Sequence, residues 1–287
     1  MQAKSVPVFP TEITDTIVES LSYSDYYGLP SIKSCALASH FFVPLCQKHI
    51  FKAIKINYLL VNGKRSPSAE DFIELITDNA SIADYVHSLS YRFGSEDAFI
   101  APALSDTLMS LKKLQSLTVG YEAAGYQPDL DWQTMELRAA FQHLLNLPTL
   151  TQLTLHDKNQ NHINNFPLSD LTLASNVDDF GIGHMDFNSG DDDFQLAIAA
   201  PLSLKRLRLG CRSEGATKTL LSATLPNGDP VVDLKGLTHL SVHFSVENRQ
   251  QDIKAIYERV TQLAHLKIEL YGETRWPLQI PIIYSGL

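Results

Sequence analysis

The sequence lacks long apolar runs and paired cysteines. It has no stretch of about 18 apolar residues, and residues 1–10 contain no apolar segment of signal-peptide length. We therefore expect a protein of the cytoplasm or nucleus with no membrane as partner. The 3 cysteines, Cys35, Cys46 and Cys211, lie far apart without a C-x-x-C pair, which predicts reduced thiols rather than disulfides or a zinc site.

Positive charge is also scarce. The chain has 23 Lys and Arg against 32 Asp and Glu, a net charge of -9. Binding to nucleic acid requires clustered cations that neutralise phosphates, so this balance argues against a nucleic-acid partner. The composition, 44% hydrophobic and 19% charged, is typical of a folded globular protein.

Motifs for catalysis or cofactor binding are missing as well. The glycine-rich segment 210–219 places Lys218 two positions too late for a phosphate-binding loop. The acidic segment 186–197 has Asp191 and Ala197 where a calcium loop needs glycine and glutamate. No histidine pair has metal-site spacing, and no nucleophile motif occurs. The sequence predicts no catalytic residue, no cofactor and no metal; an enzyme whose site is assembled from distant residues stays an alternative.

What the sequence does contain is a repeated pattern of apolar residues. They occupy the first, fourth, seventh and ninth positions of a nine-residue segment, and the last two have strand spacing. The pattern is complete at 111–119, 147–155, 234–242 and 260–268, nearly complete at 201–209, and weaker in copies ending at Ile56, Tyr91 and Ile182. These copies predict eight strands, with room for one helix after each.

Helical spacing appears between the predicted strands. The apolar stripes are Phe72/Ile76, Leu104/Leu108/Leu111, Leu137/Phe141/Leu144/Leu145 and Ile253/Ile256/Val260. Ser68 followed by Asp71 predicts an N-cap pair for the first of these helices. Amphipathic helices alone are an alternative explanation of the leucines, but they leave the small polar residues beside each closing apolar pair unexplained.

Strand and helix alternating with leucines at fixed places resembles the leucine-rich repeat family, from about Phe51 to the C-terminus. The resemblance implies an α/β solenoid over residues 53–287, with a parallel sheet on its concave face. This family usually places asparagine or cysteine three residues beyond each strand, and this chain does not. We therefore expect an irregular coil.

Residues 8–52 follow a different pattern. Pro10, Pro30 and Pro44 predict the first turns of three helices, and Ile13 and Ile17 share one face of the first helix. A module of this size usually needs support from a partner or a neighbouring domain.

The segments 9–21, 29–42 and 49–51, including the run Cys35-Ala-Leu-Ala-Ser-His-Phe-Phe42, resemble the F-box of fungal F-box-like proteins. The resemblance implies docking on a Skp-type adaptor, and through it on a cullin, in a Skp–cullin–F-box ubiquitin ligase. The adaptor-binding residues that it implies are Phe9, Pro10, Ile13, Ile17, Leu37 and Phe41. An alternative is that the three helices only cap the first repeat.

The residues that alternate with the inward apolar ones define a predicted binding face. Lys, Arg and His outnumber its two acids, Asp179 and Glu269, although the whole chain is acidic. This predicts an acidic or phosphorylated target that binds less well as salt or pH rises. The alternative is that exposed strand positions accept basic residues without any binding role. The target-binding residues selected in this way are Arg92, His156, Arg206, Arg208, His239, His243 and Lys267.

Together these patterns predict a non-catalytic substrate-recognition adaptor of a Skp–cullin–F-box ubiquitin ligase, whose repeat domain binds the target protein. The alternative function is a free-standing leucine-rich repeat scaffold or inhibitor without a ligase role.

Overall fold

A computed structural model describes residues 11–22, 28–56, 67–93, 97–121, 130–155, 162–188, 200–210, 212–245, 256, 258–271 and 278–282. The fold is mixed α/β, built on an open sheet of nine strands that is mostly parallel. In spatial order the strands are β1 (Ala53–Ile56), β2 (Ser88–Phe93), β3 (Ser116–Tyr121), β5 (Gln152–Leu155), β7 (Asp179–Ile182), β10 (Arg206–Leu209), β12 (His239–Ser245), β13 (His265–Tyr271) and β14 (Leu278–Ile282).

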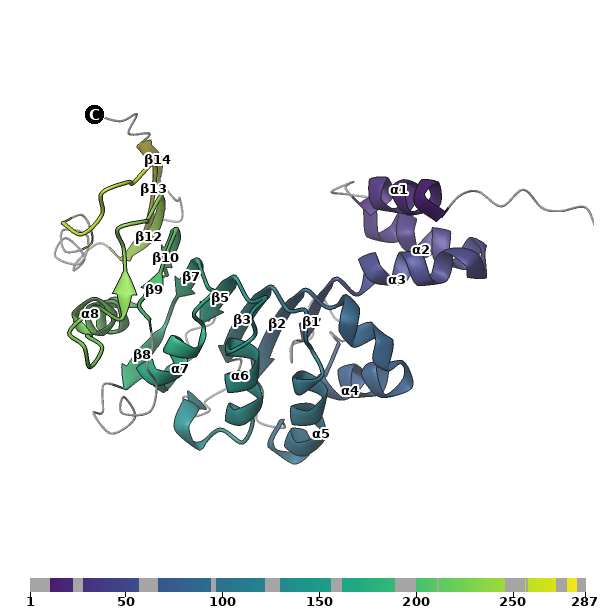
Figure 1. The fold of residues 1–287 in the computed structure, drawn as a ribbon, viewed down its shortest axis with the longest axis horizontal. Helices are drawn as coiled ribbons and strands as arrows, with labels where there is room; N and C mark the ends of the chain where they lie inside the picture. The colour runs from purple at the N-terminus through teal and green to yellow at the C-terminus, as the bar shows by residue number, and fades with distance from the viewer. Residues whose placement is uncertain are drawn as a thin grey trace, which may run out of the picture.

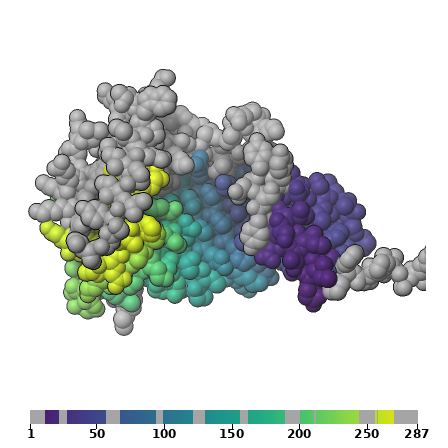
Figure 2. Space-filling view, turned by 90° about the horizontal axis from the view of Figure 1, so that it is seen from above, coloured from purple at the N-terminus to yellow at the C-terminus, as the bar shows by residue number. Residues whose placement is uncertain are grey.

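The strands follow a curve, and the helices lie along its outer side (Figure 1). These helices are α4 (Ala69–Asp78), α5 (Asp97–Met109), α6 (Arg138–Leu145), α7 (Leu168–Leu173) and α8 (Glu214–Ser222), with 3-10 turns η2 (Ala80–Tyr85) and η3 (Trp132–Thr134). Figure 2 shows the described residues in sequence order from one end of the molecule to the other. Segments close in sequence are therefore neighbours in space.

The eight predicted strands are all present, and they form the parallel part of the sheet. The predicted helical stripes at 72–76, 104–111 and 137–145 fall on α4, on α5 with the residues just after it, and on α6. The predicted cap of α4 is a full capping box: Asp71 N–H donates to Ser68 Oγ, and Ser68 N–H donates to Asp71 Oδ2 at 2.8 Å. The apolar pattern thus predicted where the strands lie, and the pair Ser68/Asp71 predicted where α4 begins.

The sheet also has features that the repeat pattern did not predict. β14 pairs antiparallel with β13. Two small parallel sheets form outside the main one: β4 (Leu130–Asp131), β6 (Ile163–Pro167) and β8 (Met185–Asn188) make one, and β9 (Leu202–Ser203) and β11 (Val232–Asp233) make the other.

The closing apolar residues of the central strands form the core. Leu117, Val119, Leu153, Leu155, Leu207, Leu209, Leu240 and Val242 are buried, as predicted. The same prediction for Leu266 and Ile268 is wrong, since both are only half-buried. α4 to α8 back the earlier strands, whereas within the described ranges the stripe that should back β13 is helical only at Ile256, and Val260 lies outside a helix.

The N-terminal residues form α1 (Thr11–Ser22), α2 (Gly28–Ala38), η1 (His40–Phe42) and α3 (Val43–Ile50). Pro30 and Pro44 lie in the first turns of α2 and α3, as predicted; Pro10 lies outside the described residues. These helices have a small core of their own, consisting of Val18, Ile32, Leu45 and Cys46. Burial, together with the neighbouring Cys35, raises the pKa of Cys46 to about 11, so this thiol stays protonated at neutral pH.

None of the helices in the described part of the chain is long and apolar enough to cross a lipid bilayer.

Candidate functional site

The inner face of the sheet carries rows of polar side chains set by the strand register. Arg206 on β10 stands beside Asp179 on β7 and beside His239 on β12, while His239 stands beside His265 on β13. Adjacent strands lie about 4.8 Å apart, so neighbours in a row are within contact distance of each other. The register therefore brings together side chains from four strands that are far apart in sequence.

Asp179 is held between two arginines. Arg206 Nε donates a hydrogen bond to Asp179 Oδ2 at 2.9 Å, and Arg208 Nη2 lies 3.0 Å from Asp179 Oδ1 in an ion pair. The Asp179 side chain is only 10% exposed, whereas that of Arg206 is 54% exposed. An internal carboxylate thus already occupies the place between the two guanidinium groups where an acidic target was expected, which leaves the cluster with one net positive charge.

Arg208 lies flat across β7. Its Nη2 donates to Thr154 Oγ1 on β5 at 3.2 Å, which requires the side chain to pass over Gly181. A Cβ added at Gly181 would lie 3.2 Å from Thr154 Cγ2 and 3.5 Å from Arg208 Nε. Glycine at this position therefore provides the space for the arginine, whose Nη2 is used in contacts within the protein.

Arg206 remains the more available of the two arginines. Its only hydrogen bond and ion pair within the described chain use Nε, which leaves both terminal Nη groups as donors on a half-exposed side chain. A guanidinium whose outer nitrogens are free can bind a carboxylate or phosphate oxygen with favourable geometry. Arg206 is therefore the residue of this cluster best placed to contact a ligand.

The histidines of the face behave differently from the prediction. His239 and His265 stack with ring centroids 4.2 Å apart. Burial, then the charges of His265 and Arg206, lowers the pKa of His239 below its ordinary value, although Asp179 acts in the opposite direction. His239 thus stays neutral when pH falls to the value at which an ordinary histidine takes up a proton, and it contributes less positive charge in mild acid than the sequence indicated.

His243 on β12 pairs with an acid on the next strand. Its Nε2 lies 2.8 Å from Glu269 on β13, which also pairs with Lys267 at 2.5 Å. The hydrogen bond from Lys267, helped by the charge of His243, lowers the pKa of Glu269, although burial acts in the opposite direction. Each of the two acids on this face is therefore shared by two basic side chains, and the face is less positive than the strand pattern suggested.

Of the remaining predicted target-binding residues, Arg92 stands apart from this cluster. Arg92 is half-buried near the end of β2 and is in register with Gly120 of β3. His156 lies outside the described residues.

A second candidate surface lies on the N-terminal helices. Ile13 and Ile17 on α1, Leu37 on α2 and Phe41 in η1 are exposed, and Leu37 reaches 89%. The predicted residues Phe9 and Pro10 lie outside the described residues. Leu29, in the first turn of α2, is exposed as well and is not among the predicted contacts. Ile13 and Ile17 are turned outward because α1 buries the positions next to them, Thr14 and Val18.

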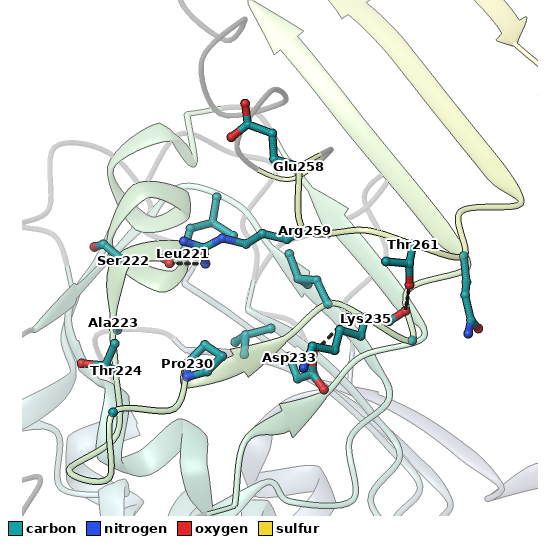
Figure 3. Close-up of a pocket in the computed structure, with 15 residues that line it drawn as sticks. Leu221, Ser222, Ala223, Thr224, Pro230, Asp233, Lys235, Glu258, Arg259 and Thr261 are labelled. Carbon is teal, nitrogen blue, oxygen red and sulfur yellow. Dashed lines mark hydrogen bonds between the residues drawn. The ribbon is translucent and has the colours of Figure 1, made fainter.

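A cleft of about 840 Å³ near the end of α8 is a candidate for small-molecule binding (Figure 3). Its polar groups mainly bond to one another: Arg259 Nη1 donates to the Leu221 carbonyl at 2.5 Å, and Thr261 Oγ1 donates to the Lys235 carbonyl at 3.1 Å. Glu258 points away from the rest. Active sites bring titratable groups together around one reacting atom, and this cleft has no such arrangement among its lining residues.

The described residues also contain no candidate metal site, since no group of three or more His, Cys, Asp or Glu among them could hold an ion. In sequence comparisons, no protein-family model and no curated protein match the chain.

Proposed function

We propose that this chain is a non-catalytic adaptor that joins two proteins. Its N-terminal helices, residues 8–52, act as an F-box-like module that docks on a Skp-type adaptor and through it on a cullin. Residues 53–287 act as an irregular leucine-rich repeat solenoid whose inner face binds the protein to be ubiquitinated. Catalysis belongs to the partners of the complex.

The observation that carries this proposal is which part of the chain holds the large apolar side chains that are exposed. Most of the large apolar residues that are exposed in the described chain lie between Ile13 and Phe41: Ile13, Ile17, Leu29, Leu37 and Phe41, against Phe99 and Met109 elsewhere. A module with so small a core gains little by leaving such side chains in water, and grouped exposed apolar residues mark protein-binding surfaces. Four of them are the residues at which the F-box resemblance implies contact with the adaptor.

The solenoid part of the proposal is supported by the strand order. Successive parallel strands are also spatial neighbours, and a helix or turn follows most of them on the outer side (Figure 1). In such an array each strand contributes one column to a continuous face, which suits the binding of an extended protein surface. Arg206, with its free outer nitrogens, supports an acidic or phosphorylated group on the target.

The test measures binding of the full chain to a purified Skp-type adaptor by isothermal titration calorimetry. Ile17→Asp should weaken binding at least about tenfold, because a charge replaces an apolar contact worth about 1.5–3 kcal/mol. Since Ile17 is exposed, circular dichroism should show an unchanged fold. Phe99→Asp is the matched control: it makes the same kind of change at an exposed apolar residue on α5 and should leave binding intact.

The alternative is a free-standing scaffold whose N-terminal helices cap the sheet. It is favoured by the contact between α3 and η2, which places the helices beside the start of the array. Absence of adaptor binding by the wild-type chain, or equal binding by wild type and Ile17→Asp, would support the scaffold and contradict the ligase role.

A further inference from the structure

The outer layer of helices contains a groove that neither proposed binding surface uses. It lies between α4 and α5, on the side of the sheet opposite to the polar face (Figure 1), and has a volume of about 620 Å³. Its position separates it from both the arginine cluster of the inner face and the exposed residues of α1 and α2.

The walls of the groove are mostly apolar and have an unusually exposed aromatic residue. Ile73 of α4 and Ile100 and Pro102 of α5 line it together with Phe99, which is 88% exposed. α5 directs Leu104 and Leu108 into the core, so Phe99 is not needed there. Phenylalanine is enriched in protein interfaces, and apolar residues exposed together mark contact sites, whereas singly exposed ones do not.

One edge of the groove is acidic. Glu70, Glu74 and Asp78 line it from α4 at intervals of four residues, and all are exposed. Within the described chain none of these carboxylates is in an ion pair, and no Lys, Arg or His lines the groove. Four residues of an α-helix advance about 6 Å, so the groove presents a negative charge about every 6 Å along its edge.

We propose that this groove binds an amphipathic helix of a partner protein, with an apolar stripe against Phe99 and Ile100 and with Lys or Arg at every fourth residue facing α4. A helix laid along α4 repeats its side chains at the same interval of about 6 Å, so its cations match the three carboxylates one to one. An acidic or uncharged helix lacks this match. The groove thus gives the protein a third binding surface, and the inference does not depend on the proposed ligase role.

The probe is a fluorescein-labelled synthetic helical peptide with leucines on one stripe and lysines at three positions four residues apart. Fluorescence anisotropy measures its binding to the full chain. Glu74→Lys and Phe99→Ser should each weaken binding at least about tenfold. Two control peptides, one with glutamates in place of the lysines and one with serines in place of the leucines, should not bind.

Matched control variants separate the groove from general effects of charge and hydrophobicity. Glu136→Lys makes the same charge change at an exposed residue before α6, and Met109→Ser removes an exposed apolar side chain at the other end of α5. Both should bind the lysine peptide as the wild type does. Phe99 and Glu74 are exposed, so thermal melts of all four variants should agree with the wild type.

Three outcomes overturn the inference. Failure of the lysine peptide to bind removes it directly. Equal weakening by Glu136→Lys and Glu74→Lys means that the peptide responds only to net charge. Concentration-dependent dimerisation that Phe99→Ser abolishes, measured by light scattering, means that a second copy of the chain occupies the groove.

Discussion

At the scale of single residues, Asp179 and its arginines show what a strand pattern can and cannot report. Period-two spacing places Asp179, Arg206 and Arg208 on the same face, and this is correct. The spacing does not predict that Asp179 is buried between the two arginines, because this contact depends on which strands are neighbours and on their register. The sequence thus indicated the members of the site but overstated the positive charge that they offer to a ligand.

The ion pair predicts a measurable coupling between Arg208 and Asp179. Arg208→Met should lower the free energy of unfolding by about 1–2 kcal/mol, because it leaves a mostly buried carboxylate with one cation instead of two. Adding Asp179→Asn should recover part of this loss, giving a coupling energy of about 1 kcal/mol. Urea denaturation of the two single variants and the double variant provides the values.

Lys205, which forms an exposed ion pair with Asp178, is the control for these variants. Its Nζ lies 2.8 Å from Asp178, and these two residues come directly before strands β10 and β7, but the Lys205 side chain is exposed. Lys205→Met should cost less than about 0.5 kcal/mol, as is usual for exposed pairs. A cost for Arg208→Met no greater than this would show that Asp179 does not depend on Arg208.

At the scale of elements, the main strands were predictable and the minor ones were not. In a strand buried on one side, apolar and polar residues alternate, so the eight main strands could be located from the sequence. β9 and β11 have two residues each, too few for a period, and the antiparallel pairing of β14 depends on a chain reversal with no strong turn motif. The F-box resemblance named Leu37 and Phe41, but only the folded helices show that Leu29 is exposed as well.

In strand β7, Gly181 lies close to Thr154 of β5 and Arg208 of β10. Replacing a glycine within a strand by alanine usually stabilises a protein by about 0.5–1 kcal/mol. Gly181→Ala should instead destabilise it by about 1 kcal/mol, because the new Cβ meets Thr154 Cγ2 at 3.2 Å and Thr154 Oγ1 at 3.3 Å. In a Thr154→Ser background the methyl group is absent, so the same substitution should cost less. Thermal or urea unfolding measures both.

Gly215 in α8 is the reference for this experiment, since no atom lies within 4 Å of its added Cβ. Gly215→Ala should stabilise the protein by about 0.5–1 kcal/mol. If Gly181→Ala stabilises it equally, Arg208 and Thr154 move aside freely, and the close packing over β7 has no energetic role.

At the scale of the whole molecule, the chain folds around two cores of very different size. One core extends from Ile56 to Ile256, and the other consists of Val18, Ile32, Leu45 and Cys46 with a few partly buried neighbours. Stability follows the apolar area buried, so the N-terminal helices should open more readily than the sheet.

Hydrogen exchange followed by mass spectrometry tests this difference. Peptides from α1 to α3 should exchange faster than peptides from β3, β5 and β7. Ile32→Ala should cost about 2–4 kcal/mol within the small core and speed exchange only in residues 11–50, whereas Leu153→Ala should speed it throughout the sheet. Uniform acceleration by Ile32→Ala would mean that the two cores unfold as one unit.

The strict register of the parallel strands also constrains how the sequence can vary. Each residue whose side chain lies on the inner face has fixed neighbours on the adjacent strands, as Asp179, Arg206 and His239 show. This holds although the segments joining the strands differ in length. An insertion or deletion between strands therefore leaves these neighbours unchanged, while one inside a strand reverses which side chains face the core. A point substitution of a residue on the inner face alters one contact of that face and leaves the buried leucines on the other side of the sheet unchanged. The inner face can thus diversify during evolution while the core stays the same.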